Sequence, residues 1–96
     1  MAHILIVDDD VELSRVLAKV LQGFGHDAHL VHSGEDALVA TRADREYDLV
    51  LLDLQLGGID GIETLRRLRV RQPSLAVVGV TGFGSVADAV RAMRLG

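Results

Sequence analysis

The chain has 96 residues, a length that fits a single small domain spanning residues 1–96. Hydrophobic residues make up 49% of it, three residues are aromatic and none is cysteine, so we expect an aliphatic core and exclude disulfides and thiolate metal sites. The net charge of −4 argues against direct nucleic-acid binding, and no apolar run approaches the roughly 20 residues of a membrane span. The first residues lack an export signal, so the expected location is cytoplasmic.

The chain opens with a buried strand followed by a helix. Residues 4–7 form an unbroken aliphatic run, typical of a parallel strand with both faces covered, and three aspartates follow directly at positions 8–10. Apolar residues then recur at the spacing of a helix, at Leu13, Val16, Leu17, Val20 and Leu21. We expect Asp10 to cap the start of this helix and Gly23 to mark its end.

The next segment predicts an edge strand and a second helix. Residues 28–31 are short and more polar, which suits the edge of a sheet, and we interpret the histidines around them as ordinary polar residues of that edge: His26, His29 and His32. The sequence from Ser33 to Asp36 has the spacing of a capping box and predicts a helix through Ala40.

A central strand ends at a single carboxylate. Residues 49–52 are four consecutive aliphatic residues, typical of a strand covered by helices on both faces, and Asp53 follows them. Two glycines at positions 57 and 58 then predict a loop. The sequence from Asp60 to Glu63 repeats the capping pattern and opens a helix with arginines on its outer side, which we interpret as a solvated face.

A fourth strand and a fourth helix complete the alternation. Residues 75–80 are the strand, Thr81 closes it, and Ser85 opens the last predicted helix. Strict alternation of strands and helices predicts an α/β fold with a doubly wound parallel sheet.

Acidic residues follow two of these strands, and parallel strands end at the same edge of a sheet. If the first and third strands are neighbours, Asp8, Asp9 and Asp53 converge there, and clustered carboxylates favour a hard cation such as Mg²⁺. A solvated acidic rim without function is the alternative. Other chemistries lack their residues: no glycine-rich turn follows the first strand, and Gln55 stands where an aspartyl phosphatase has its second aspartate.

Three motifs together resemble the receiver domain of bacterial two-component response regulators. They are Ile4-Leu5-Ile6-Val7-Asp8-Asp9-Asp10, Leu51-Leu52-Asp53-Leu54-Gln55-Leu56-Gly57-Gly58-Ile59-Asp60-Gly61, and Val80-Thr81-Gly82. The resemblance covers the whole chain in order and spacing. It implies a flavodoxin-like fold with strand order 2-1-3-4, and a phosphoprotein whose output is transcriptional.

The resemblance also implies a role for each matching residue. Asp53 would accept a phosphoryl group from a partner sensor histidine kinase. Mg²⁺ would be bound by Asp9, by Asp53 and by the backbone carbonyl of Gln55, with Asp8 acting through a water molecule. Thr81 would hydrogen-bond the phosphoryl group and act as the switch. On this interpretation the chain is a phosphoacceptor and not an enzyme.

The chain departs from the family pattern in two places. Leu56-Gly57 stands where the family usually has Met-Pro. The family also has a fifth strand–helix unit that supplies a phosphate-binding lysine, whereas the only lysine here is Lys19 in the first helix. We therefore interpret the chain as a receiver domain truncated before that unit, and expect it to be phosphorylated poorly. We also expect a homodimer formed through the face that the missing unit would cover. The alternative is a protein–protein interaction or dimerisation module that has lost phosphotransfer.

Overall fold

Four parallel strands form one sheet in the computed structural model, which describes residues 1–42, 46–54, 56 and 60–80. They are β1 (His3–Val7), β2 (Asp27–Val31), β3 (Leu49–Asp53) and β4 (Ala76–Val80), in the order β2-β1-β3-β4. This order confirms the predicted flavodoxin-like arrangement, with the polar strand β2 at an edge. The predicted helix that opens at Ser85 lies outside the described residues.

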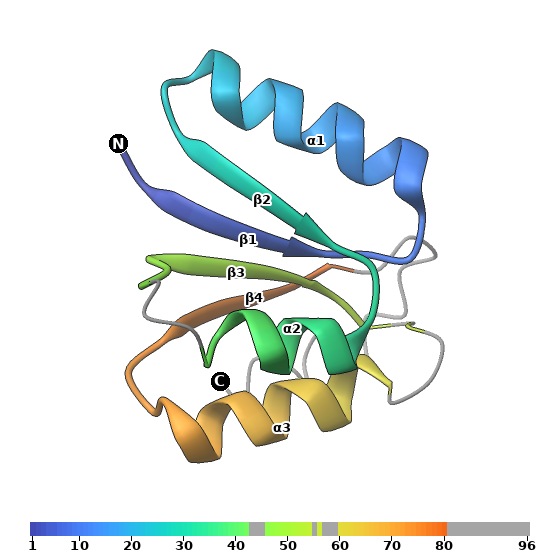
Figure 1. The fold of residues 1–96 in the computed structure, drawn as a ribbon, viewed down its shortest axis with the longest axis vertical. Coiled ribbons are helices and arrows are strands. Elements are labelled where there is room, and N and C mark those ends of the chain that lie inside the picture. Colours follow the sequence, from blue (N-terminus) through green and yellow to red (C-terminus); the bar gives the residue numbers. More distant parts are fainter. Residues whose placement is uncertain (43–45, 55, 57–59, 81–96) are drawn as a thin grey trace.

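Three helices cover the sheet on both faces. α1 (Val11–Gly23) lies on one face, while α2 (Gly34–Ala40) and α3 (Gly61–Arg71) lie side by side on the other (Figure 1). Within the described part of the chain, none of the helices is long and apolar enough to cross a membrane.

The predicted caps begin all three helices. The side chains of Asp10, Ser33 and Asp60 each accept a hydrogen bond from the backbone N–H three residues further on, at 3.0, 3.0 and 2.7 Å. Each cap satisfies one of the N–H groups that the first turn of a helix leaves without a partner. The start of every helix is therefore set by the sequence itself.

Alternate side chains of the central strands supply two separate cores. Leu5, Val7, Val50 and Leu52 point toward α2 and α3, where the buried residues Leu65 and Leu68 of α3 meet them. Ile4 and Ile6 point to the opposite face and pack against Ala18 of α1. Both faces of β1 are buried, and β3 is buried on one face and half-buried on the other, so both strands are continuous aliphatic runs in the sequence.

The apolar residues predicted for α1 are buried only in part: Leu17 and Leu21 pack against the sheet, and the other three do not. Ser14 and Ala18 are buried, whereas Leu13, Val16 and Val20 are 49%, 59% and 50% exposed. The helix therefore carries two neighbouring apolar stripes, of which only one faces the sheet. Apolar spacing predicted the helix correctly but could not say which stripe is inside.

The arginines of α3 are only partly a solvated face, which corrects the interpretation from sequence. Arg66, Arg67 and Arg71 are exposed as interpreted, but Arg69 is half-buried and donates hydrogen bonds to the backbone oxygens of Pro73 and Leu75. Arg71 donates to the carbonyl oxygen of Leu38 at 2.9 Å and to the hydroxyl of Thr41. Arg71 thus joins the end of α3 to the end of α2, where helix carbonyl groups lack partners within their own helix.

Candidate functional site

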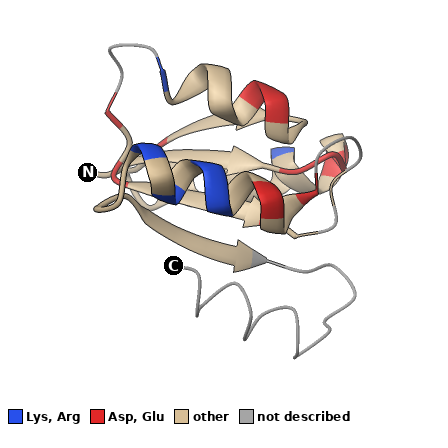
Figure 2. Ribbon diagram, turned by 90° about the horizontal axis from the view of Figure 1, so that it is seen from below, with Lys and Arg blue, Asp and Glu red and all other residues tan. Residues whose placement is uncertain are grey.

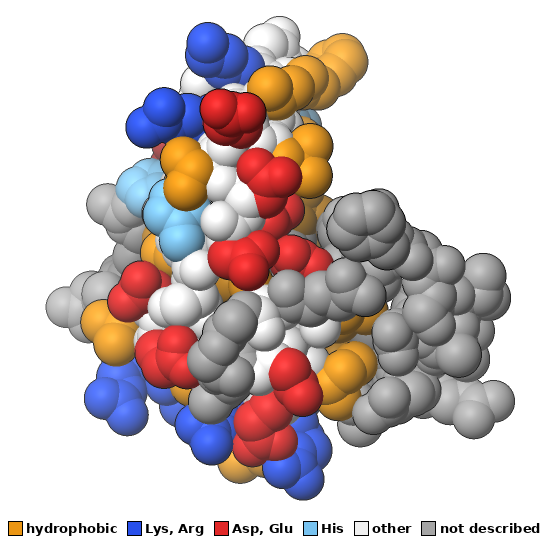
Figure 3. All heavy atoms as spheres, turned by 90° about the vertical axis from the view of Figure 1, so that its right-hand side faces the viewer, with side chains coloured by type: hydrophobic (Ala, Val, Ile, Leu, Met, Phe, Trp, Pro, Cys, Tyr) orange, Lys and Arg blue, Asp and Glu red, His pale blue; other side chains and the backbone are white. Residues whose placement is uncertain are grey.

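The acidic residues that follow β1 and β3 lie together at one edge of the sheet. β1 and β3 are adjacent and parallel, with Val7 opposite Leu52, so the residues after them stand level. Asp8, Asp9 and Asp53 each offer a carboxylate oxygen, and these oxygens lie within 4.8 Å of one another. Figure 3 looks onto this side of the molecule and shows acidic side chains gathered across it. The convergence predicted from the sequence is therefore present.

Asp8 is the buried member of this acidic cluster, with 9% of its surface exposed. Its backbone N–H donates to the carbonyl oxygen of Val31 at 3.1 Å, and its carboxylate accepts the N–H of Asp10 at 2.9 Å. Burial raises the pKa of the Asp8 carboxyl, and the negative charge of Asp53 raises this pKa further, although the hydrogen bond from Asp10 opposes both effects. The site therefore holds more negative charge than its surroundings stabilise.

The three carboxylates fit a hard divalent cation. They offer only oxygen donors, which is the ligand type that Mg²⁺ prefers, and Asp9 is exposed, so an ion there would keep water ligands. The raised pKa of Asp8 is a second observation that fits, because a cation would remove the repulsion that causes part of it. Asp8, Asp9 and Asp53 are the described residues that would hold it.

His32 belongs to the surroundings of this site, although sequence reasoning treated it as an ordinary edge residue. Its Nδ1 lies 2.9 Å from the carbonyl oxygen of Asp8, so this nitrogen carries the proton and donates. The strand register explains the contact: Val31 pairs with Val7, which places the next residue of each strand side by side. The contact holds the main chain that carries Asp8 and Asp9.

Gly61 is a second residue that sequence reasoning missed. A Cβ atom at this position would lie far inside van der Waals contact of the Asp53 carbonyl oxygen and the Leu54 Cα, and 2.8 Å from the Leu54 carbonyl carbon. The first turn of α3 therefore packs directly against the main chain at the end of β3. Only glycine permits so close an approach, and it fixes the backbone on which Asp53 stands.

The remaining predicted site residues fall outside the described part of the chain. These are Gln55, whose carbonyl was expected to bind the metal, and Thr81, which was expected to bind the phosphoryl group. Lys19 lies on α1 and is exposed.

A comparison with protein families matches residues 4–96 to the response regulator receiver domain. This chain belongs to that family. Its acidic cluster lies where the sequence resemblance to receiver domains had placed it, at the carboxyl edge of the sheet. The recognition made from the three motifs is thereby confirmed.

Relatives and solved structures agree with this assignment. The transcriptional regulatory protein ZraR of Salmonella typhimurium is 40% identical over 93 residues, covering 97% of this receiver domain and 21% of ZraR. The receiver domain of NtrX from Brucella abortus has a TM-score of 0.90 and 37% identity, covering 97% of this chain and 78% of that one. A Burkholderia pseudomallei response regulator, solved with a phosphorylated aspartic acid, a calcium ion and citrate, has a TM-score of 0.89 and 28% identity, covering 100% and 56%. The chain spans about a fifth of the length of ZraR.

Proposed function

We propose that this receiver domain accepts a phosphoryl group on Asp53 from a phosphohistidine of a sensor histidine kinase, and so controls a transcriptional output domain. The observation that carries the proposal is the convergence of Asp8, Asp9 and Asp53 at the carboxyl edge of the sheet. The phosphorylated aspartic acid in the Burkholderia structure and the regulatory name of ZraR support it. The cytoplasmic location expected from the sequence remains a prediction.

The transfer needs a fixed nucleophile more than it needs acid–base chemistry. A carboxylate oxygen of Asp53 attacks phosphorus in line, the phosphorus–nitrogen bond breaks, and the imidazole of the donor leaves with the electron pair. Asp53 is the last residue of β3, and Leu52 before it is fully buried, so the backbone of Asp53 is held in place. This positioning supplies the near-attack geometry on which the rate depends.

Asp8 and Asp9 would hold Mg²⁺ together with Asp53. The bound ion would supply positive charge that offsets the negative charge of the incoming phosphoryl group. The contact from His32 to the Asp8 carbonyl supports the main chain after β1, and the packing of Gly61 supports the main chain at the end of β3. Neither residue touches the reacting atoms, so both act by positioning.

Phosphorylation would bring a further −1.5 to −2 charges to a cluster that is already acidic. A new charge of this size draws nearby hydroxyl and amide donors toward the phosphoryl group and moves the segments that carry them. We assign the switching hydrogen bond to Thr81, which follows β4 directly. β4 pairs with β3 as far as Val80 and Asp53, so these two strands end at the same edge of the sheet.

Phosphoramidate tests this proposal because its phosphorus–nitrogen bond imitates phosphohistidine. Incubated with phosphoramidate and Mg²⁺, a fraction of the protein should gain the mass of one phosphoryl group, at the low yield expected from the sequence. Asp53→Asn should abolish this gain, and Asp36→Asn, an exposed carboxylate on α2, should leave it unchanged. Equal incorporation into wild type and Asp53→Asn would refute the assigned nucleophile.

A second candidate function is a dimerisation module without phosphotransfer. The exposed apolar stripe of α1 favours it: Leu13, Val16 and Val20 are about half exposed or more, and Phe24 just beyond the helix is 78% exposed. Such a stripe is a common feature of protein interfaces. The phosphoramidate experiment separates the two functions, since this module would bind a second copy but gain no phosphoryl group.

A further inference from the structure

A groove runs between α2 and α3, on the face of the sheet opposite α1. Its volume is about 460 Å³, and its apolar lining comes from Leu38 of α2 and Val70 of α3. Val70 is 80% exposed, which is unusual for an aliphatic residue beside a helix–helix contact. Nothing in the phosphoacceptor chemistry uses this groove, because the acidic cluster stands at the carboxyl edge of the sheet.

Four arginines surround the apolar lining: Arg42, Arg66, Arg67 and Arg71. Among the described lining residues Glu63 is the only acidic one, so these residues together carry a net charge of +3 in a chain whose net charge is −4. Figure 2 shows the arginines of α3 gathered along that helix, with the acidic Glu63 in its first turn. The groove is therefore a basic strip on an acidic molecule.

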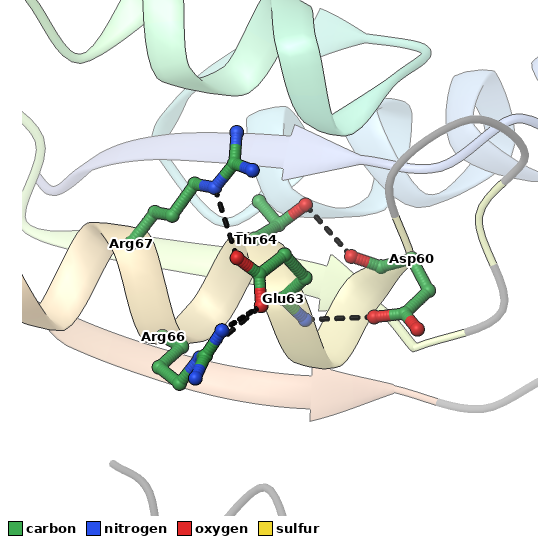
Figure 4. Close-up of polar contacts among 5 residues, drawn as sticks. All are labelled: Asp60, Glu63, Thr64, Arg66 and Arg67. Carbon is green, nitrogen blue, oxygen red and sulfur yellow. Dashed lines mark hydrogen bonds and ion pairs between the residues drawn. The ribbon is translucent and has the colours of Figure 1, made fainter.

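Hydrogen bonds hold three of these arginines in place. The carboxylate of Glu63 lies between the guanidinium groups of Arg66 and Arg67 and accepts from both (Figure 4). Arg71 is fixed at the other end by the Leu38 carbonyl and the Thr41 hydroxyl. An arginine held this way loses less side-chain freedom when it binds a further carboxylate.

We propose that the groove between α2 and α3 docks an acidic amphipathic segment of a protein partner. Carboxylates of the segment pair with the arginines, and an aliphatic side chain rests between Leu38 and Val70. Nucleic acid fits less well, because its phosphates make no favourable contact with the apolar lining. A longer polyanion would also be repelled by the negative charge on the rest of the surface. The partner's chemistry is thus an acidic helix with an apolar stripe.

A synthetic helical peptide of about 15 residues, with leucines flanked by glutamates, is the probe for this test. Titrated into the ¹⁵N-labelled protein, it should shift amide signals of α2 and α3 and leave those of α1 unchanged. Arg42→Glu should weaken its affinity about tenfold, equivalent to about 1.4 kcal/mol. Val70→Asp should weaken it severalfold, since Val70 supplies apolar contact.

Arg15→Glu on the exposed side of α1 is the matched control, because it makes the same charge change away from the groove and should leave the affinity unchanged. If Arg42→Glu and Arg15→Glu lowered the peptide affinity equally, binding would depend only on the net charge of the protein, and the proposal would be overturned. Single-stranded DNA of equal charge that binds as tightly as the peptide would also overturn it, in favour of a general polyanion site. Both variants should keep the amide spectrum of the folded protein, since both positions are exposed.

Discussion

At the scale of single residues, the main feature of this receiver domain is a cluster of three carboxylates whose oxygens lie within 4.8 Å of one another. At that separation and an effective dielectric near 20, each pair repels by about 3 kcal/mol. The raised pKa of Asp8 is one consequence of this repulsion and of burial. A bound cation would offset this repulsion.

Replacing one carboxylate should therefore stabilise the metal-free protein and remove its response to Mg²⁺. At one hundred times its dissociation constant, Mg²⁺ should stabilise the wild type by about 2.7 kcal/mol. Asp53→Asn should melt higher than wild type in EDTA, yet gain much less from Mg²⁺. Thermal unfolding with and without Mg²⁺ measures both effects, with Asp36→Asn as the control. The same gain from Mg²⁺ in wild type and Asp53→Asn would show that the site is misplaced.

Gly61 should tolerate no side chain. Gly61→Ala places a methyl group against the main chain of Asp53 and Leu54, and we expect a loss of about 1–3 kcal/mol together with weaker Mg²⁺ binding. Gly23→Ala is the matched control, because a Cβ at Gly23 meets nothing within 4 Å. Urea denaturation compares the two variants. Equal stability of Gly61→Ala and Gly23→Ala would mean that α3 is not seated against β3 as described.

At the scale of elements, caps, strand runs and the strand order were predicted from the sequence, whereas most side-chain contacts between elements were not. Asp10, Ser33 and Asp60 cap the helices they were predicted to cap, because a cap is a local hydrogen bond. The inward face of α1 and the bond from Arg71 to α2 depend on how elements pack, which no local pattern encodes. The site was predictable for a different reason: parallel strands bring their carboxyl ends together whatever the side chains are.

Arg71 should contribute more to stability than its neighbour Arg66. Arg71 donates hydrogen bonds to the Leu38 carbonyl and the Thr41 hydroxyl at the C-terminal end of α2. Losing hydrogen bonds from a charged group costs about 1.5–3 kcal/mol of stability. Arg66 pairs only with Glu63 on an exposed face, where such pairs contribute about 0–1 kcal/mol. Urea denaturation of Arg71→Ala and Arg66→Ala tests this order, and a larger loss for Arg66→Ala would contradict it.

The carboxylate of Asp27, at the start of β2, contacts His3, at the start of β1. Asp27 Oδ2 lies 3.1 Å from His3 Nδ1 and 3.3 Å from His29 Nε2. The hydrogen bond from His3 is the main reason why the pKa of Asp27 is lowered from its usual value of 3.8. A lowered carboxyl pKa adds stability that is present above pH 3.8 and is lost as the pH falls through the folded-state value. We therefore expect the stability difference between wild type and Asp27→Asn to shrink below pH 3.8. Urea midpoints from pH 7 to pH 3 measure it, and a constant difference would disprove the linkage.

At the scale of the whole molecule, two exposed features predict self-association. Within the sheet of described strands, β4 has β3 on one side only, and α1 shows its second apolar stripe to solvent. An unpaired strand edge and an apolar stripe are features that a second copy can cover around a twofold axis. We expect a dimer at micromolar concentration in sedimentation, and Val16→Glu should weaken it. A single monomeric species of 10.3 kDa would contradict this prediction.

Chemical trapping of the phosphorylated residue tests the central claim most directly. Borohydride reduces an aspartyl phosphate to homoserine, so the modified residue can be located by peptide mass spectrometry after treatment with phosphoramidate. We predict homoserine at position 53, only when Mg²⁺ is present during phosphorylation, and at no other aspartate. Homoserine at Asp8 or Asp9, or equal labelling of Asp53 in EDTA, would contradict the assignment of a metal-dependent phosphoacceptor site at the end of β3.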